Sequence, residues 1–139
     1  MKGKRFDFAL LVLRLGVGIS IAYAHGYGKI TGGPDKWEKI GGAMKDIGIT
    51  FLPIFWGFMA AFAEFFASLF VAIGFLTRGA AFLVAFTMFV AFYGHMKAGD
   101  GFAEASHSFD LMCIFIFLLI VGAGKYSLDN RIKFLKWLQ

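Results

Sequence analysis

The sequence predicts an all-α fold, an integral membrane four-helix bundle with an amphipathic interfacial helix in the first outer loop. Two observations lead to this prediction, the composition and a set of long apolar runs. Of the 139 residues, 59% are hydrophobic and 17% are charged, and the mean hydropathy is +0.72. A soluble domain usually has about 45–50% apolar and about 25% charged residues. We therefore expect residues 1–139 to form a single domain whose main solvent is the lipid bilayer.

Four apolar runs approach the length of a membrane-spanning helix, which is about 20 residues. We expect spans at about 6–24, 52–76, 79–96 and 107–122. Only residues 77–79 separate the second run from the third, which predicts a tight turn between antiparallel neighbours. Backbone groups in lipid must find hydrogen-bond partners within the protein, and continuous apolar runs satisfy this requirement as helices.

The distribution of Lys and Arg predicts the orientation. The amino-terminal basic residues precede an apolar run, as in a signal peptide, but this run contains Arg14 and no clean cleavage site follows it. We therefore expect it to stay as the first span. With the amino terminus inside, the inner segments hold eight Lys and Arg residues and the outer loops hold five. This bias favours cytoplasmic amino and carboxyl termini.

The first outer loop has a helical pattern of its own. Pro34 suits the first turn of a helix, and the apolar residues that follow are spaced by three, four and three positions: Trp37, Ile40, Met44 and Ile47. The opposite side carries Lys36, Lys39 and Lys45. We expect a helix that lies flat in the headgroup region, either as a lid packed on the bundle or as a gate over a site beneath it.

Two charged residues fall well inside predicted spans, Arg14 in the first and Glu64 in the second. An isolated charge at mid-membrane costs about 2.5–3.5 kcal/mol on insertion scales, so such residues usually face the protein interior and find partners. The predicted spans place the two residues at similar depths. We therefore expect an Arg14–Glu64 ion pair, which either fixes the helix register or contributes to function.

A second group of polar residues gathers at the outer ends of the spans: His25, Lys29, His95, His107 and Asp110. The three histidines come from three different spans, and they are candidates to hold a metal ion or haem. Alternatively, these side chains could hydrogen-bond the carbonyl groups of a quinone and relay its protons. The alternative without a functional role is that each histidine is a solvated residue at the end of a helix.

Several function classes are disfavoured by the sequence. The formal net charge is +5, but the basic residues gather at span ends rather than on one polar face, so we expect no nucleic acid partner. The chain has a single cysteine, Cys113, so it cannot form a dithiol pair by itself. It also has no glycine pattern of a nicotinamide-binding fold. Whether the chain is an enzyme stays open, but it is not a self-sufficient dithiol or nicotinamide enzyme.

An ordered set of short motifs runs through nearly the whole chain: RLGVG at 14–18, His25-Gly26 and Lys29, Leu52-Pro53, Glu64, GFLTRGAA at 74–81, and GKYSLD at 124–129. This set resembles the DoxX family. The resemblance implies a four-helix protein of a bacterial or archaeal cytoplasmic membrane. The chain departs from the family pattern at Asp110, where a glutamate is expected, and at Ala123, where a proline is common.

The resemblance also implies a range of activities. Some relatives are linked to membrane redox chemistry, including a thiosulfate:quinone oxidoreductase that works with a DoxD-type subunit, and others to oxidative-stress complexes. Distant relatives act as membrane chaperones or cargo receptors. Our leading hypothesis is a membrane subunit of a quinone-linked redox system, with a redox partner protein and room for a homo-oligomer. Its predicted cofactor-binding residues are Arg14, His25, Lys29, Glu64, His95, His107 and Asp110.

Two other functions stay open at this point. The first is a non-enzymatic scaffold or chaperone that holds a partner protein through the lid and the helix faces. The second is a pathway for a small solute or protons, because ionisable residues inside a membrane mark such routes.

Overall fold

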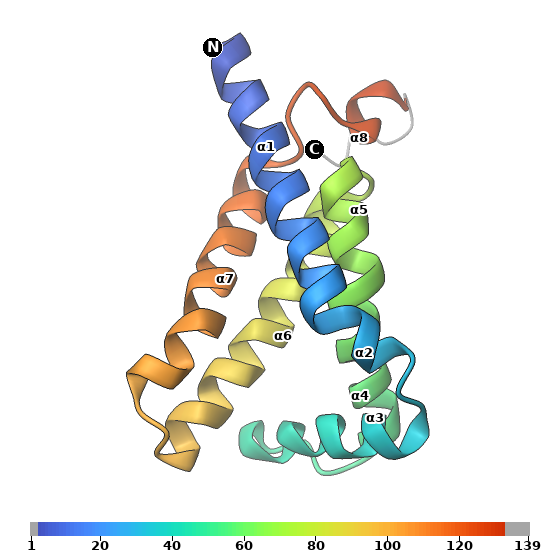
Figure 1. Ribbon diagram of the computed structural model, residues 1–139, viewed down its shortest axis with the longest axis vertical. Helices are drawn as coiled ribbons and strands as arrows, with labels where there is room; N and C mark the ends of the chain where they lie inside the picture. Colours follow the sequence, from blue (N-terminus) through green and yellow to red (C-terminus); the bar gives the residue numbers. More distant parts are fainter. Residues whose placement is uncertain (1–2, 133–139) are drawn as a thin grey trace.

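The structure, a computed structural model, describes residues 3–132 and is built from helices that run nearly antiparallel to one another (Figure 1). Within these residues no strand is present, and four helical segments are long and apolar enough to cross a membrane: Lys4–Ile30, Pro53–Ile73, Thr77–Ala98 and Phe102–Val121. The predicted all-α membrane bundle is therefore confirmed.

The first membrane helix is longer than the sequence predicts. It consists of α1 (Lys4–Ile21), a π-helical turn η1 (Ala22–Gly26) and α2 (Tyr27–Ile30). The helix ends at Ile30, whereas the sequence predicted an end near residue 24. Gly33, which follows, has a φ of 78°, a value that glycine adopts readily and that interrupts a helix. Gly26 lies within this helix and does not end it. Its lack of a side chain allows close packing, because a Cβ there would lie 2.4 Å from the backbone oxygen of Glu64.

The second membrane helix contains a matching irregularity. It consists of α4 (Pro53–Phe62), a π-helical turn η3 (Ala63–Ala67) and α5 (Ser68–Ile73). The turns η1 and η3 pack against each other. Single π-helical turns inside α-helices are frequent at functional sites, since the extra residue changes the direction of neighbouring side chains. Here η3 carries Glu64 and η1 carries His25.

The third and fourth membrane helices, α6 (Thr77–Ala98) and α7 (Phe102–Val121), form a neighbouring pair. Residues 77–79, predicted as a turn, lie instead in the first turn of α6. The turn is formed by residues 74–76, because the Asp129 carboxylate accepts hydrogen bonds from the N–H groups of Leu76 and Thr77 and so starts the helix earlier. Likewise α7 begins at Phe102, before the predicted position 107.

The loop between the first two membrane helices contains the predicted helix. It forms α3 (Pro34–Gly41) followed by a 3₁₀ helix η2 (Gly42–Ile47), and it runs across the end of the bundle (Figure 1). We call α3 and η2 the lid. The lid packs closely on α4, where a Cβ at Gly57 would lie 1.7 Å from the Trp37 oxygen. The apolar stripe is turned toward the bundle, while Lys36, Lys39 and Lys45 are exposed.

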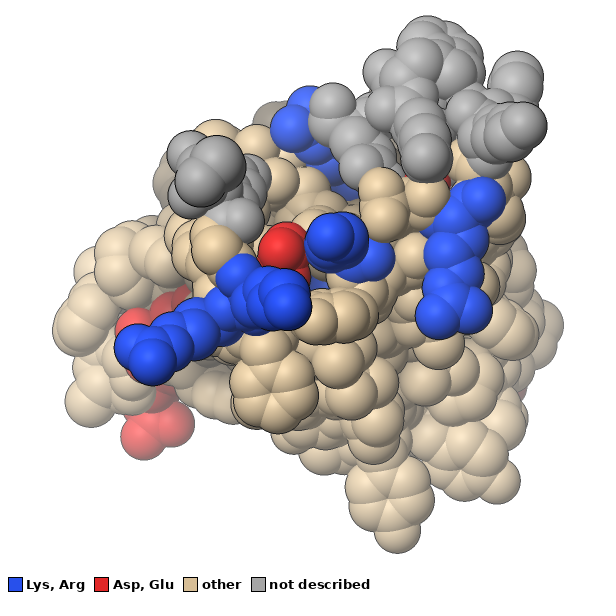
Figure 2. All heavy atoms as spheres, turned by 90° about the horizontal axis from the view of Figure 1, so that it is seen from above, with Lys and Arg blue, Asp and Glu red and all other residues tan. Residues whose placement is uncertain are grey.

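The opposite end of the bundle holds the amino-terminal turn of α1, the segment 122–127 and the short helix α8 (Leu128–Arg131). Figure 2 views this end and shows Lys and Arg side chains around a few carboxylates. We call it the basic end, defined by Lys4, Arg5, Arg78, Lys125 and Arg131. The orientation prediction also counted Lys2, Lys133 and Lys136, which lie outside the described residues.

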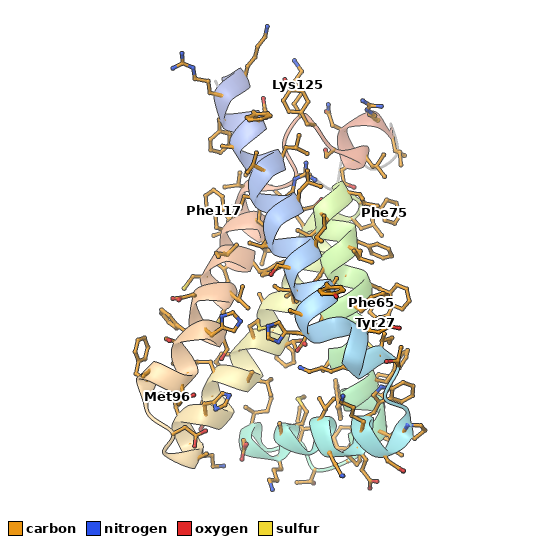
Figure 3. The ribbon with its side chains drawn as sticks, viewed as in Figure 1. Tyr27, Phe65, Phe75, Met96, Phe117 and Lys125 are labelled. Carbon is orange, nitrogen blue, oxygen red and sulfur yellow. The ribbon has the colours of Figure 1, made fainter. Side chains whose placement is uncertain are left out.

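The bundle has small residues inside and large aromatic residues outside. Ala61, Ala67 and Ala81 are fully buried, whereas Phe117 is 41% exposed. In Figure 3 the side chains of Phe75 and Phe117 project away from the bundle on opposite sides. Small interior residues allow close helix packing in a membrane, where lipid chains can cover the outward aromatic rings.

Candidate functional site

The strongest candidate site is built around Glu64, in the π-helical turn η3. Its side chain is only 4% exposed, and Lys29 of α2 is its partner. Lys29 Nζ lies 2.7 Å from each carboxylate oxygen, but it donates a hydrogen bond only to Oε1. The contact with Oε2 lies outside hydrogen-bond geometry but is still an ion-pair contact, so the Lys29 ammonium group faces both carboxylate oxygens.

A buried donor without a partner lies on the same cavity as Glu64. The indole Nε1 of Trp56, on α4, donates no hydrogen bond within the described residues. A buried indole N–H usually finds an acceptor, and each buried polar atom left unsatisfied costs about 1–3 kcal/mol. An ion-paired carboxylate and a donor without an acceptor therefore line one space in the protein.

This cavity has a volume of about 160 Å³ and lies between the lid, α4, η3 and α6. Lys29, Glu64 and Trp56 supply its main polar groups. The rest of the lining is mostly apolar and includes the two methionines Met44 and Met59 and the ring of Phe86. We call it the Glu64 cavity.

The lid is attached firmly beside this cavity. Trp37 Nε1 donates a hydrogen bond to the Lys29 oxygen at 2.8 Å, and Lys36 Nζ donates one to the Gly28 oxygen at 2.7 Å. The Trp37 ring also packs edge-on against Phe58, with centroids 5.1 Å apart. Of the two roles predicted for the lid, it therefore performs at least the packing role, and it covers a cavity with ionisable groups.

The predicted Arg14–Glu64 ion pair is wrong. Arg14 Nη1 donates to the oxygens of Val71 and Ala72, and its Nη2 donates to the Tyr126 oxygen at 2.6 Å. Arg14 thus binds the carboxyl end of α5 rather than the middle of the second membrane helix.

The helix register explains the error. Gly26, not Arg14, packs on Glu64, and these two positions of the first helix are about 18 Å apart at 1.5 Å per residue. The prediction ended the first span near residue 24, which placed Lys29 outside the helix and beyond reach of Glu64. The structure instead continues the helix to Ile30 and brings Lys29 to the carboxylate.

Two of the three predicted histidines come together. His25 of η1 and His107 of α7 have their Nε2 atoms 3.4 Å apart, and their rings are 5.4 Å apart between centroids. His95 does not join them, because its Nδ1 contacts the Asp100 carboxylate at 2.7 Å at the end of α6. All three histidines are exposed on the protein.

The remaining predicted residue, Asp110, is exposed on α7, one turn after His107. Within residues 3–132 no group of three His, Cys, Asp or Glu side chains is arranged to hold a metal ion. The seven predicted residues therefore separate into four places: Arg14 at α5, Lys29 with Glu64, His25 with His107 near Asp110, and His95 with Asp100.

Sequence reasoning missed Trp56 and the role of the 124–129 motif. The only indication for Trp56 in the sequence was its indole N–H in an otherwise apolar helix. Four aromatic residues nearby made this tryptophan look like one more apolar side chain. The 124–129 segment folds back on the basic end, where Asp7 accepts a hydrogen bond from the Lys125 N–H at 3.0 Å. Its contacts are with chain segments more than 50 positions away, which no local pattern predicts.

Comparison with known proteins gives one match. The DoxX family model matches residues 9–96, which cover α1 through most of α6 and include Arg14, Lys29 and Glu64. The match ends before α7 and the 124–129 motif. No curated protein and no solved structure matches the chain.

Proposed function

Because the chain belongs to the DoxX family of membrane proteins, we propose that it is a membrane subunit of a quinone-linked redox system and that a quinone headgroup binds in the Glu64 cavity. The family match supports the membrane architecture, and the redox context follows from the resemblance described in the sequence analysis. The chemistry of the cavity gives the ligand.

The observation that carries this proposal is the unsatisfied Trp56 Nε1, which lines the same cavity as the ion-paired Glu64 carboxylate. Buried polar atoms in native proteins are nearly always hydrogen-bonded, so this exception needs an explanation. A quinone carbonyl accepts a hydrogen bond from an indole N–H, and a quinol hydroxyl accepts this bond or donates one to a carboxylate oxygen.

The size and lining of the cavity fit one aromatic ring. An apolar cavity of about 150 Å³ is large enough for benzene, and the Glu64 cavity has about 160 Å³. Thioether sulfurs make favourable contacts with aromatic rings, and Met44 and Met59 both line the space. A long isoprenoid tail would have to extend beyond the cavity into the surrounding lipid.

In this role, Lys29 and Glu64 would bind the quinone oxygens and take part in proton transfer. Reduction of a quinone takes up two electrons and two protons, and the reverse reaction releases them. The Lys29 ammonium group would hydrogen-bond a carbonyl oxygen as charge develops on it, and the Glu64 carboxylate would accept a proton from a quinol hydroxyl. The electrons would come from or go to a partner protein, since the chain has no dithiol.

The test is a binding titration of the purified chain in neutral detergent with decylubiquinone, followed by tryptophan quenching and thermal shift. We expect saturable binding, and we expect Glu64→Gln to weaken it at least about tenfold, or about 1.4 kcal/mol. The matched control is Glu104→Gln, which removes an exposed carboxylate from α7 and should leave binding unchanged.

Equal binding by wild type and Glu64→Gln, or no saturable binding at all, would overturn the proposal. In the second case the scaffold or chaperone alternative gains, because the family membership supports the membrane architecture without a ligand. The same titration monitored by absorbance also reveals any redox-active cofactor retained on purification.

A further inference from the structure

A second and larger cavity lies toward the basic end of the bundle, away from Glu64 and Lys29. Its volume is about 540 Å³, and it lies between α4, α5, the start of α6 and the segment after α7. Much of its wall is hydrocarbon, from residues such as Phe62, Phe70 and Leu83. This volume falls within the range of pockets that hold small organic ligands, about 300–1,000 Å³.

One part of this cavity is polar and cationic. Arg78 and Thr77, in the first turn of α6, both line it. Thr77 is 1% exposed, yet its Oγ1 has no hydrogen-bond partner among the described residues. The Arg78 Nε is also buried and without an acceptor, while its Nη2 donates to the Ile120 oxygen at 3.2 Å. Unused donors thus border an apolar space.

The charges around these donors favour an anion. Helix α6 has 22 residues, and the amino terminus of a helix attracts negative charge through its free N–H groups and its dipole. Asp129 also lines the cavity and opposes an anion, but its two oxygens accept from the Leu76 and Thr77 N–H groups, and Arg14 interacts with it electrostatically. No ion pair joins Arg78 to a carboxylate within residues 3–132.

From these observations we infer that the cavity binds an anionic phospholipid, with the phosphate at Arg78 and Thr77 and part of an acyl chain along the apolar wall. The phosphate accepts hydrogen bonds from the guanidinium Nε and the Thr77 hydroxyl, beside the Leu76 and Thr77 N–H groups that Asp129 already occupies. The end of the bundle around it is rich in Lys and Arg (Figure 2), which attract anionic headgroups. The site is independent of the proposed quinone site.

The proposed lipid site differs from general lipid contact in the headgroup that it requires. A membrane protein is covered by lipid everywhere, and aromatic residues project from most of its outer surface. Phosphatidylcholine carries the same phosphate but also a quaternary ammonium group, which the Lys and Arg side chains of the basic end repel, so the site favours lipids that carry a net negative charge. Zwitterionic lipids of the same chain length should bind the same hydrocarbon wall without that selection.

Native mass spectrometry and thermal shift of the full chain in neutral detergent test the inference, with dioleoyl phosphatidylglycerol and dioleoyl phosphatidylcholine as probes. We expect the anionic lipid to be retained at least about tenfold more strongly, a difference of about 1.4 kcal/mol. Arg78→Gln should abolish this preference. Arg131→Gln is the matched control, because it removes an exposed arginine at the same end that does not line the cavity.

A second variant keeps the test decisive if Arg78→Gln does not fold. Gly79 lines the cavity, and a Cβ there would meet no atom within 4 Å, so the side chain of Gly79→Phe starts in open space and we expect its ring to occupy part of the cavity. It should reduce retention of both lipids, and because Gly79 does not line the Glu64 cavity, decylubiquinone binding should change far less, although Leu83 lines both cavities. Glycerol phosphate, which has the phosphate but no acyl chain, should not stabilise the protein.

Three results would overturn the inference: equal retention of the two lipids by wild type, an equal loss of preference in Arg131→Gln, or full retention in Gly79→Phe. Stabilisation by glycerol phosphate alone would also overturn it, since a free phosphate site would then replace the lipid site. None of these results bears on the quinone proposal, because that site lies at Glu64.

Discussion

Arg14 and Glu64 are both buried charged residues inside membrane helices, but their partners and surroundings differ. Arg14 is fully buried, and its two terminal nitrogens donate to three backbone oxygens at the carboxyl end of α5 and in the 122–127 segment, while its Nε has no acceptor among the described residues. Glu64 has a single side-chain partner, Lys29, which lies 2.7 Å from both carboxylate oxygens. Arg14 lies in packed protein, whereas Glu64 lies on a cavity.

The difference separates a structural charge from a binding one. The last carbonyl groups of a helix have no partner within the helix, and a guanidinium group with several donors can satisfy them. Arg14 therefore completes the fold and joins three segments. An ion-paired carboxylate on a cavity, beside an indole N–H without an acceptor, is arranged for a ligand that supplies that acceptor.

The largest expected effect is that of Arg14→Met on stability. The substitution removes the side-chain donor of three carbonyl groups, of which Val71 still accepts from the Gly74 N–H, and it removes the cation near Asp129. We expect a loss of about 3–5 kcal/mol, as for a broken buried charge interaction. Chemical unfolding in detergent measures it. Arg14→Lys, which keeps the charge, should lose less stability and bind decylubiquinone normally; weakened binding in the lysine variant would place Arg14 in the ligand site.

Next in size is the effect of Lys29→Met. It leaves the Glu64 carboxylate buried without a partner, which we expect to cost about 2–3 kcal/mol. The double variant Lys29→Met/Glu64→Gln should recover most of this loss, because a neutral amide needs no cation. A double-mutant cycle by thermal unfolding measures the coupling. If the double variant is as unstable as Lys29→Met, the carboxylate is not what Lys29 stabilises.

The two described tryptophans near the cavity offer a matched comparison. Trp37→Phe removes a hydrogen bond to the Lys29 oxygen, so we expect it to lower stability by about 1 kcal/mol. Trp56→Phe removes a donor that has no acceptor, so stability should change by less than about 0.5 kcal/mol while decylubiquinone binds more weakly. Thermal shift with and without decylubiquinone measures both. The reverse pattern would show that Trp56 Nε1 serves the fold.

The smallest effect is expected at the histidine pair. His25 and His107 are both exposed and contact each other at 3.4 Å. His25→Ala should change stability by less than about 0.5 kcal/mol, as at most surface positions. It should also leave decylubiquinone affinity within about twofold, because the pair does not line the Glu64 cavity. A large loss of affinity would extend the ligand site to the pair, as the sequence first suggested.

The sequence alone determined the class of the fold. Four helices in lipid follow from hydropathy, and the lid helix follows from the spacing of Trp37, Ile40 and Met44, because both properties depend on neighbouring residues only. It also singled out Arg14, Lys29 and Glu64 as candidate functional residues, because charged residues are rare within membrane-spanning helices.

Only the tertiary structure decided which partner each charge finds. The helix ends depend on distant contacts, such as Asp129 at the start of α6, and the register depends on close packing such as Gly26 against Glu64. The observed register places Gly26, about 18 Å along the helix from Arg14, beside Glu64, so Glu64 pairs with Lys29 rather than with Arg14. The cavity and its unsatisfied indole N–H follow from that register, so no local pattern could predict them.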